Sequence, residues 1–227
     1  MRQYSVPFAN RIFRGIFRPI FRLVFYLLSD GKIIGKENIP THGPYMVTIN
    51  HISLFEAPFI AAFWPKPLEA AGAVEIWDRP GQATLVRLYG GIQVHRGEFD
   101  RQVLETMIAA LKSGRPLLIA PEGRRSHAPG MQRAMPGVAY IVEKTGVPVL
   151  PVGFVGTTED FLSRAIHFQR PRIEMRIGKP IILPPVEGKG ATRRESLQAN
   201  ADRIMLAIAA LIPPEYHGVY RSSKEPA

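Results

Sequence analysis

Short apolar segments alternate with helix-like segments over most of the chain, and this alternation constrains the fold more than any other feature. The apolar segments are bounded by turn residues, as buried strands are, whereas the segments between them repeat their apolar residues with helical spacing. Predicted strands cover 45–49, 91–94, 116–120, 147–154 and 173–177, and predicted helices cover 100–112, 136–144 and 192–211. Such alternation is typical of α/β proteins. We therefore expect a single domain with a central, at least partly parallel sheet flanked by helices.

Local signals place the ends of several elements. Pro136 suits the first position of a helix, and Gly146 suits the position just beyond its end. Thr192 followed by Glu195 has the spacing of a capping box and predicts the start of the last helix. Residues 31–44 are rich in turn formers and are expected to lead into the first strand.

The composition describes a folded protein with a polyanionic partner. Hydrophobic residues make up 46% of the 227 residues and charged residues 21%, which is ordinary for a globular domain with a sizeable core. The chain has no cysteine, so disulfides, cysteine nucleophiles and thiolate metal sites are excluded. The net charge of +10 indicates nucleic acid, an anionic membrane surface or a phosphorylated substrate as a partner.

The first 29 residues contain five arginines and no acidic residue, and they predict a helix at a membrane interface. At 100° per residue, four of these arginines fall within about 80° of one another. They are Arg11, Arg14, Arg18 and Arg22. Apolar residues, among them Phe13 and Phe17, fill much of the remaining circumference. We expect the arginines to contact anionic headgroups and the phenylalanines to enter the upper acyl region.

Two features qualify this helix. Pro19 lies inside it and predicts a kink or a division into two short helices. The arginines interrupt any apolar run long enough to span a bilayer or to form the core of a signal peptide. The alternative interpretation is a helix that packs its apolar side on the domain and leaves its arginines in solvent.

Polar residues follow several of the predicted strands. His51 and Glu56 follow the first of them in NHISLFE, Arg96 follows the next in GIQVHRG, and Glu122 and Arg125 follow a third in APEGRRS. Parallel strands would bring these residues together at one edge of the sheet. On its own, NHISLFE would equally fit a capping histidine and a solvated glutamate.

These residue types together indicate proton transfer and phosphate binding. Imidazole accepts a proton from an alcohol near neutral pH, and a carboxylate behind it holds the tautomer. Arginine binds phosphate through two parallel hydrogen bonds. The set therefore indicates an alcohol that attacks an acyl carbon while arginines hold a phosphate on the same substrate.

Four segments in this order, NHISLFE, GIQVHRG, PEGRRS and VPVLPVGFVG, resemble the four sequence blocks of the glycerolipid acyltransferases. The resemblance runs from Asn50 to Gly156 and is strongest to the 1-acylglycerol-3-phosphate acyltransferases. It implies transfer of a fatty acyl group from acyl-CoA or acyl carrier protein to the free hydroxyl of lysophosphatidic acid. The product would be phosphatidic acid for phospholipid biosynthesis, and no cofactor beyond the acyl co-substrate is implied.

The resemblance assigns roles to residues of the first three blocks. His51 matches the catalytic histidine, and Glu56 stands where the family usually has aspartate. Arg96 and Arg125 match arginines that bind the substrate phosphate. The additional methylene of Glu56 means that its carboxylate must fold back or support His51 from a different position.

The third and fourth blocks complete the set. Glu122 and Gly123 belong to the block that shapes the acceptor site, and Pro148 and Pro151 belong to the block on the acyl-chain side. Arg124 stands where the family commonly has threonine, and its extra charge would touch phosphate, coenzyme A, membrane or solvent.

The resemblance also implies a location and a division of the chain. Residues 1–30 would form a membrane-interface helix or helix pair, and residues 31–227 the catalytic domain. The enzyme would act at the cytoplasmic face of a membrane, with a lysolipid, acyl-CoA or acyl carrier protein, and an anionic membrane surface as its partners.

Other functions remain as alternatives. An acyltransferase for another lysolipid, such as lyso-ornithine lipid, and a non-catalytic lipid-binding protein both fit the departures at Glu56 and Arg124. The sequence lacks nucleic-acid-binding signatures, a Gly-x-Ser-x-Gly hydrolase motif and clusters with metal-ligand spacing. We therefore expect neither a nucleic-acid partner nor a metal site.

Overall fold

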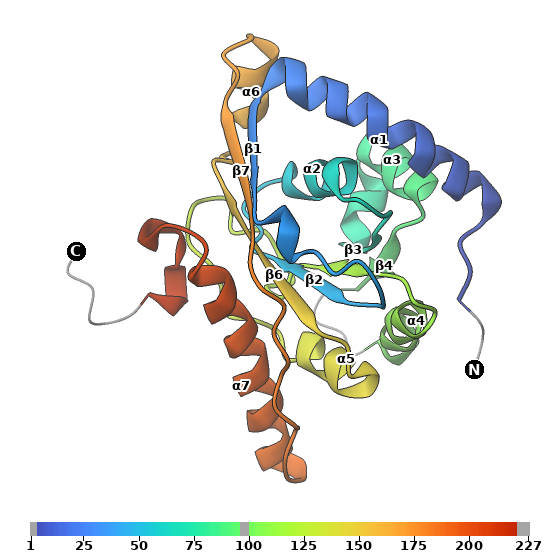
Figure 1. The fold of residues 1–227 in the computed structure, drawn as a ribbon, viewed down its shortest axis with the longest axis vertical. Helices are drawn as coiled ribbons and strands as arrows, with labels where there is room; N and C mark the ends of the chain where they lie inside the picture. The colour runs from blue at the N-terminus through green and yellow to red at the C-terminus, as the bar shows by residue number, and fades with distance from the viewer. Residues whose placement is uncertain (1–3, 96–99, 222–227) are drawn as a thin grey trace.

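The computed structural model describes residues 4–95 and 100–221, which form one α/β domain around a seven-stranded sheet (Figure 1). The strand order is β1-β7-β6-β2-β5-β3-β4. The strands are β1 Asp30–Ile34, β2 Met46–Ile49, β3 Glu69–Ala73, β4 Ile92–Val94, β5 Leu117–Ile119, β6 Val149–Val155 and β7 Arg172–Ile177. Neighbouring strands run parallel except β6 and β7. The expectation of an at least partly parallel sheet is confirmed.

Helices cover both faces of this sheet. They are α1 Phe8–Leu28, α2 Glu56–Phe63, α3 Gln82–Tyr89, α4 Arg101–Lys112, α5 Gly137–Thr145, α6 Phe161–Ile166 and α7 Gly190–Ala209. Along β2, Met46 packs in a core with α4, α5 and α7, whereas Val47 packs in a core with α1, α2 and α6. Because both faces are covered, β2 is buried along its whole length, as strands of parallel sheets are.

Several predicted helix ends are confirmed. The carboxylate of Asp100 accepts a hydrogen bond from Val103 N at 3.1 Å and caps α4. Gly146 ends α5 with a φ of 66°, a conformation that glycine adopts at little cost. The capping box at Thr192 is wrong, because α7 begins at Gly190 and Lys189 precedes it without a side-chain cap.

Two strands differ from the sequence prediction. β1 overlaps the turn-rich segment, and β3 lies in a stretch for which no strand was predicted. Of the helix or helix pair expected for residues 1–30, the structure contains the single helix, because α1 runs through Pro19 over 21 residues. Gly15, whose carbonyl loses its partner to Pro19, is exposed, and the freed oxygen can therefore bind water.

The orientation of α1 corrects our expectation for its arginines. Arg14 is only 2% exposed and forms an ion pair with Glu69 of β3. The Arg18 guanidinium donates hydrogen bonds to the carbonyls of Trp64 and Pro65, at the end of α2. The expectation that this side of the helix faces outward is wrong, because the charge of Glu69 and the last carbonyls of α2 attract it inward.

The rest of α1 follows from this orientation. Arg22 Nε donates to the Ala62 carbonyl at 2.7 Å, and Phe17 is buried with Phe13 half-buried beside it. Arg11 remains exposed. The outward face of α1 is apolar and comprises Phe8, Ile12, Ile16, Ile20, Leu23, Val24, Tyr26 and Leu27. We call this set the α1 apolar face.

In the part of the chain that the structure describes, no helix has the length and apolar character needed to span a bilayer.

Candidate active site

His51 lies just beyond the carboxyl end of β2. The preceding residue, Asn50, accepts a hydrogen bond from Phe154 N at 2.7 Å and donates one to Phe154 O at 3.0 Å. This buried side chain joins the end of β2 to β6 after the main-chain ladder has stopped. The chain can then turn outward, so that the His51 side chain is 19% exposed at the edge of the sheet.

Glu56 is the first residue of α2, and its carboxylate supports His51. Glu56 Oε2 lies 3.1 Å from His51 Nδ1, and the glutamate side chain is fully buried. A carboxylate oxygen accepts, so Nδ1 carries the proton and Nε2 keeps its lone pair. The predicted pairing of these residues is therefore present, with the additional methylene accommodated.

The second oxygen of Glu56 has its own donors. Oε1 accepts hydrogen bonds from Ser53 N at 2.9 Å, from Ser53 Oγ at 3.2 Å and from the hydroxyl of Thr157. Ser53 belongs to the turn before α2, whereas Thr157 follows β6. The carboxylate is thus held by two separate segments of the chain.

Glu122 connects His51 to the loop after β5. Its Oε1 accepts from His51 N at 2.8 Å, and its Oε2 accepts from Gln132 N at 2.7 Å. Burial raises the pKa of Glu122 to about 7, although both main-chain hydrogen bonds and the nearby His51 favour the charged form. Glu122 therefore organises two loops around the candidate site.

The loop after β5 lies alongside His51 and brings Arg125 to the site. Ser126 N donates to the carbonyl of His51 at 2.8 Å, and Gln132 Nε2 donates to the carbonyl of Arg125 at 3.2 Å. Gly123 closes the turn after β5, where its N–H donates to the Ala120 carbonyl at 3.1 Å, and its φ of 68° lies in the left-handed region that favours glycine. The backbone of Arg125 is consequently fixed one residue from a direct contact with His51.

The remaining predicted site residues comprise one position that the structure does not describe and two prolines that it places away from His51. Arg96 lies outside the described residues. Pro148 and Pro151 lie before and within the first half of β6, whereas His51 is level with the end of that strand. Both prolines are therefore displaced along β6 from the His51–Glu56 pair.

Sequence reasoning missed the residues that hold the pair in place. Asn50 and Ser53 stand within NHISLFE, and Thr157 directly follows the fourth block. Gln132 stands in a segment that we did not predict to reach the site. Position in the sequence places the first three within or directly beside the blocks, but only the fold shows which polar groups they meet.

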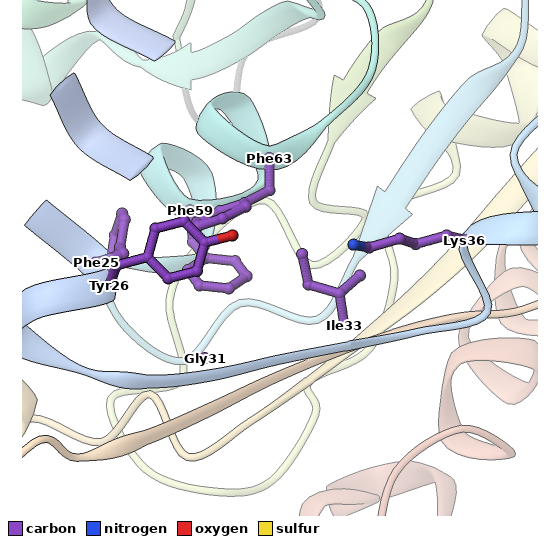
Figure 2. A pocket seen from close by; sticks show the side chains of 7 residues that line it. All are labelled: Phe25, Tyr26, Gly31, Ile33, Lys36, Phe59 and Phe63. Atoms are coloured by element: carbon purple, nitrogen blue, oxygen red, sulfur yellow. The ribbon is translucent and has the colours of Figure 1, made fainter. Parts of the chain in front are cut away.

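A separate cleft of about 90 Å³ lies between the end of α1, β1 and α2. In Figure 2 the rings of Phe25, Tyr26 and Phe59 gather on one side, and the Lys36 side chain points toward them from the other. Ile33, Phe63 and Gly31 complete its lining, so Lys36 is its only charged residue among those that the structure describes. Within the described part of the chain, none of the predicted catalytic or phosphate-binding residues lines this cleft.

Comparison with known proteins identifies the family. A family described as Acyltransferase matches residues 31–155, more than half of the chain. Lyso-ornithine lipid O-acyltransferase of Pseudomonas aeruginosa is 23% identical over 188 residues, which cover 75% of this chain and 70% of that protein.

The fold also matches that of a solved structure. The crystal structure of the 1-acyl-sn-glycerophosphate (LPA) acyltransferase PlsC from Thermotoga maritima superposes with a TM-score of 0.63 at 23% identity. The match covers 89% of this chain and 79% of that one. Together with the four sequence blocks, these similarities show that the chain belongs to the acyltransferase family.

Proposed function

We propose that the protein transfers a fatty acyl group from a thioester donor, acyl-CoA or acyl carrier protein, to the free hydroxyl of a lysolipid. The observation that carries this proposal is the His51–Glu56 pair, held at the sheet edge beside the loop that contains Arg125. Membership of the acyltransferase family supports the reaction type.

The geometry assigns each group one part in the reaction. With Nδ1 bonded to Glu56, Nε2 of His51 accepts the proton of the lysolipid hydroxyl as its oxygen attacks the thioester carbon. The negative charge of Glu56 favours the imidazolium that forms. When the tetrahedral intermediate collapses, the carbon–sulfur bond breaks and the imidazolium returns its proton to the leaving thiolate.

We propose Arg125 as the residue that binds an acceptor phosphate. Its main chain is fixed next to His51 through Ser126 and Gln132, so an acceptor held by its guanidinium would lie close to the base. Arg96 is proposed as a second phosphate ligand. Lysophosphatidic acid carries a phosphate monoester, which arginine binds through two parallel hydrogen bonds. It is therefore the first candidate acceptor.

Lyso-ornithine lipid is the second candidate acceptor. A protein named for its action on this lipid is similar over most of the chain. Its headgroup has a carboxylate and an ammonium but no phosphate, so Arg125 would bind the carboxylate through the same guanidinium geometry.

An acceptor panel tests the proposal. Purified protein with lipid vesicles would be given labelled acyl-CoA or acyl carrier protein, together with lysophosphatidic acid, lyso-ornithine lipid or monoacylglycerol. We expect thiol release coupled to a diacyl product, with lysophosphatidic acid giving the highest kcat/KM. A preference for lyso-ornithine lipid would select the second candidate. Binding of lipid without acylation of any acceptor would instead favour a non-catalytic lipid-binding protein.

We also propose that the α1 apolar face docks on the membrane, with the protein on the cytoplasmic side. Eight large apolar side chains on one helix are exposed together, which is typical of a surface that binds lipid. Tyr26 belongs both to this face and to the cleft of Figure 2, so the Lys36 ammonium lies close enough to meet an anionic headgroup. The exposed Arg11 and the net charge of +10 would add attraction to an anionic surface.

A further inference from the structure

We propose that Thr157 is a positioning residue for the His51–Glu56 pair, and that its hydroxyl adapts the site to a glutamate at position 56. The inference rests on the proposed function, because it assumes that this pair performs the proton transfer. Thr157 lies outside the four sequence blocks, directly after the last of them.

The contact joins two distant segments. Thr157 is fully buried in the segment that follows β6, and its hydroxyl donates a hydrogen bond to Glu56 Oε1, 101 residues away in the sequence. Glu56 Oε2 is directed to His51 Nδ1 at 3.1 Å. Thr157 and His51 therefore hold opposite oxygens of one carboxylate.

The length of the Glu56 side chain explains why the hydrogen bond from Thr157 is needed to orient the carboxylate. Glutamate has one more rotatable bond than aspartate, so its carboxylate has more freedom to turn away from the imidazole. Ser53 also binds Oε1, but it lies three residues before Glu56 and belongs to the same turn. Thr157 instead ties the carboxylate to the sheet through β6. Its hydroxyl consequently fixes the orientation of Oε2 relative to His51. Hydrogen-bond partners orient metal-ligating side chains in the same way.

A purely structural role for Thr157 makes a different prediction. A buried hydroxyl needs a partner, and Glu56 supplies one whether or not catalysis depends on it. In that case, removal of the hydroxyl would change the stability of the fold and leave turnover unaltered. Measurements of kcat, KM and thermal stability on the same variants therefore separate the two roles.

The first test compares Thr157→Val, which keeps the shape, with Thr157→Ser, which keeps the hydroxyl. We expect Thr157→Val to lower kcat about 10- to 100-fold, the range seen when a hydrogen-bond partner that orients a site residue is removed. The KM values for the lysolipid and for the acyl donor should stay within about twofold of wild type. Thr157→Ser should retain kcat within about threefold. A Thr157→Val variant with wild-type kcat, or a Thr157→Ser variant with equal loss, would overturn the proposal.

The second test uses Glu56→Asp and does not depend on the folding of Thr157→Val. Although this substitution installs the usual residue of the family, the shorter side chain cannot keep the contacts to His51 and Thr157 together. We expect kcat to fall at least about tenfold. Equal or higher activity of Glu56→Asp would contradict the idea that this site is built for glutamate.

The double variant provides a check on the coupling. In the Glu56→Asp background, Thr157→Val should lower kcat by no more than about twofold further, because the hydroxyl has already lost its carboxylate. Fully multiplicative effects would show that Thr157 acts independently of position 56. Failure of this inference can be told apart from failure of the proposed function. If His51→Ala retains wild-type kcat, the proposed function is wrong. If His51→Ala is inactive while Thr157→Val retains wild-type kcat, only the role of Thr157 is wrong.

Discussion

At the residue scale, the buried carboxylate of Glu122 joins two loops of the candidate site. Both of its oxygens accept hydrogen bonds from main-chain N–H groups, one from His51 and one from Gln132. A neutral amide would present its NH₂ group to one of these donors. The loops that carry His51 and Arg125 therefore depend on an acid at this position.

The burial of Glu122 predicts a specific pH dependence of stability. Its pKa rises from 4.5 to about 7 in the folded protein, so the fold retains a proton that the unfolded chain releases in this window. The free energy of unfolding should consequently fall by up to roughly 3 kcal/mol as the pH rises from 4.5 to 7. Glu122→Gln does not titrate and should lack this contribution.

Denaturant unfolding of both proteins across this pH window provides the measurement. All other side chains are common to both proteins, so the difference between the two curves reports on Glu122. A difference that stays constant from pH 4.5 to 7 would show that Glu122 titrates as an ordinary exposed acid.

The proposed phosphate role of Arg125 predicts a change in acceptor binding. Arg125→Ala should raise KM for lysophosphatidic acid about 10- to 100-fold, because a hydrogen bond to a charged group is worth about 1.5–3 kcal/mol. Initial-rate kinetics with monoacylglycerol, which lacks the phosphate, provide the control. An equal loss with both acceptors would contradict a role in phosphate binding.

At the element scale, α1 is fastened to the domain by buried charge. Arg14 donates from both terminal nitrogens to Glu69, at 2.8 Å each, and from Nε to the carbonyl of Tyr89. Burial alone would raise the pKa of Glu69, but the hydrogen bonds and charge of Arg14 hold it below its usual range. Tyr4 and Arg115 also bind this carboxylate, so the N-terminal segment, α1 and β3 share one network.

Loss of Arg14 should therefore destabilise the fold strongly. Arg14→Ala leaves Glu69 buried without its main partner, and we expect the free energy of unfolding to fall by about 3–5 kcal/mol. Arg11→Ala, a change at an exposed position of the same helix, should alter it by no more than about 0.5 kcal/mol. Chemical denaturation would measure both, and equal small effects would rule out an anchoring role for Arg14.

The α1 apolar face makes a separate prediction for membrane binding. Ile16 and Ile20 are 53% and 52% exposed, so their joint replacement by serine should leave the fold intact. Vesicle affinity should fall at least about tenfold, because burying each isoleucine in lipid contributes about 1.5–3 kcal/mol. Co-sedimentation with vesicles would measure this change.

Leu206→Ser supplies the matched control for the membrane experiment. Leu206 is equally exposed but lies on α7, which covers the opposite face of the sheet. Its replacement should leave vesicle binding unchanged. If this variant bound as weakly as the double isoleucine variant, the α1 apolar face would not be the docking surface.

At the scale of the whole molecule, parallel strands gather residues that are far apart in the sequence. β2 lies between β5 and β6, so the segments after these three strands meet at one edge of the sheet. They supply His51, Glu122 and Thr157 in turn. The sequence predicted this arrangement for the first two segments, because their apolar runs end just before the polar residues.

The elements that the sequence failed to predict lack local signals. β3 reads EAAGA and contains no β-branched or aromatic residue, and four residues of β1 are exposed at the edge of the sheet. The orientation of α1 also depends on groups far away in the chain. Periodicity separates its two faces, but Glu69 and the carbonyls at the end of α2 decide which face is buried.

The turnover of His51→Ala shows most directly whether His51 is the general base of an acyl transfer. Initial rates with saturating lysolipid and acyl donor should fall by a factor on the order of 10² to 10⁴ in this variant. His42→Ala, at an exposed histidine outside the site, should turn over like the wild type. Near wild-type turnover in folded His51→Ala would show that another group accepts the proton.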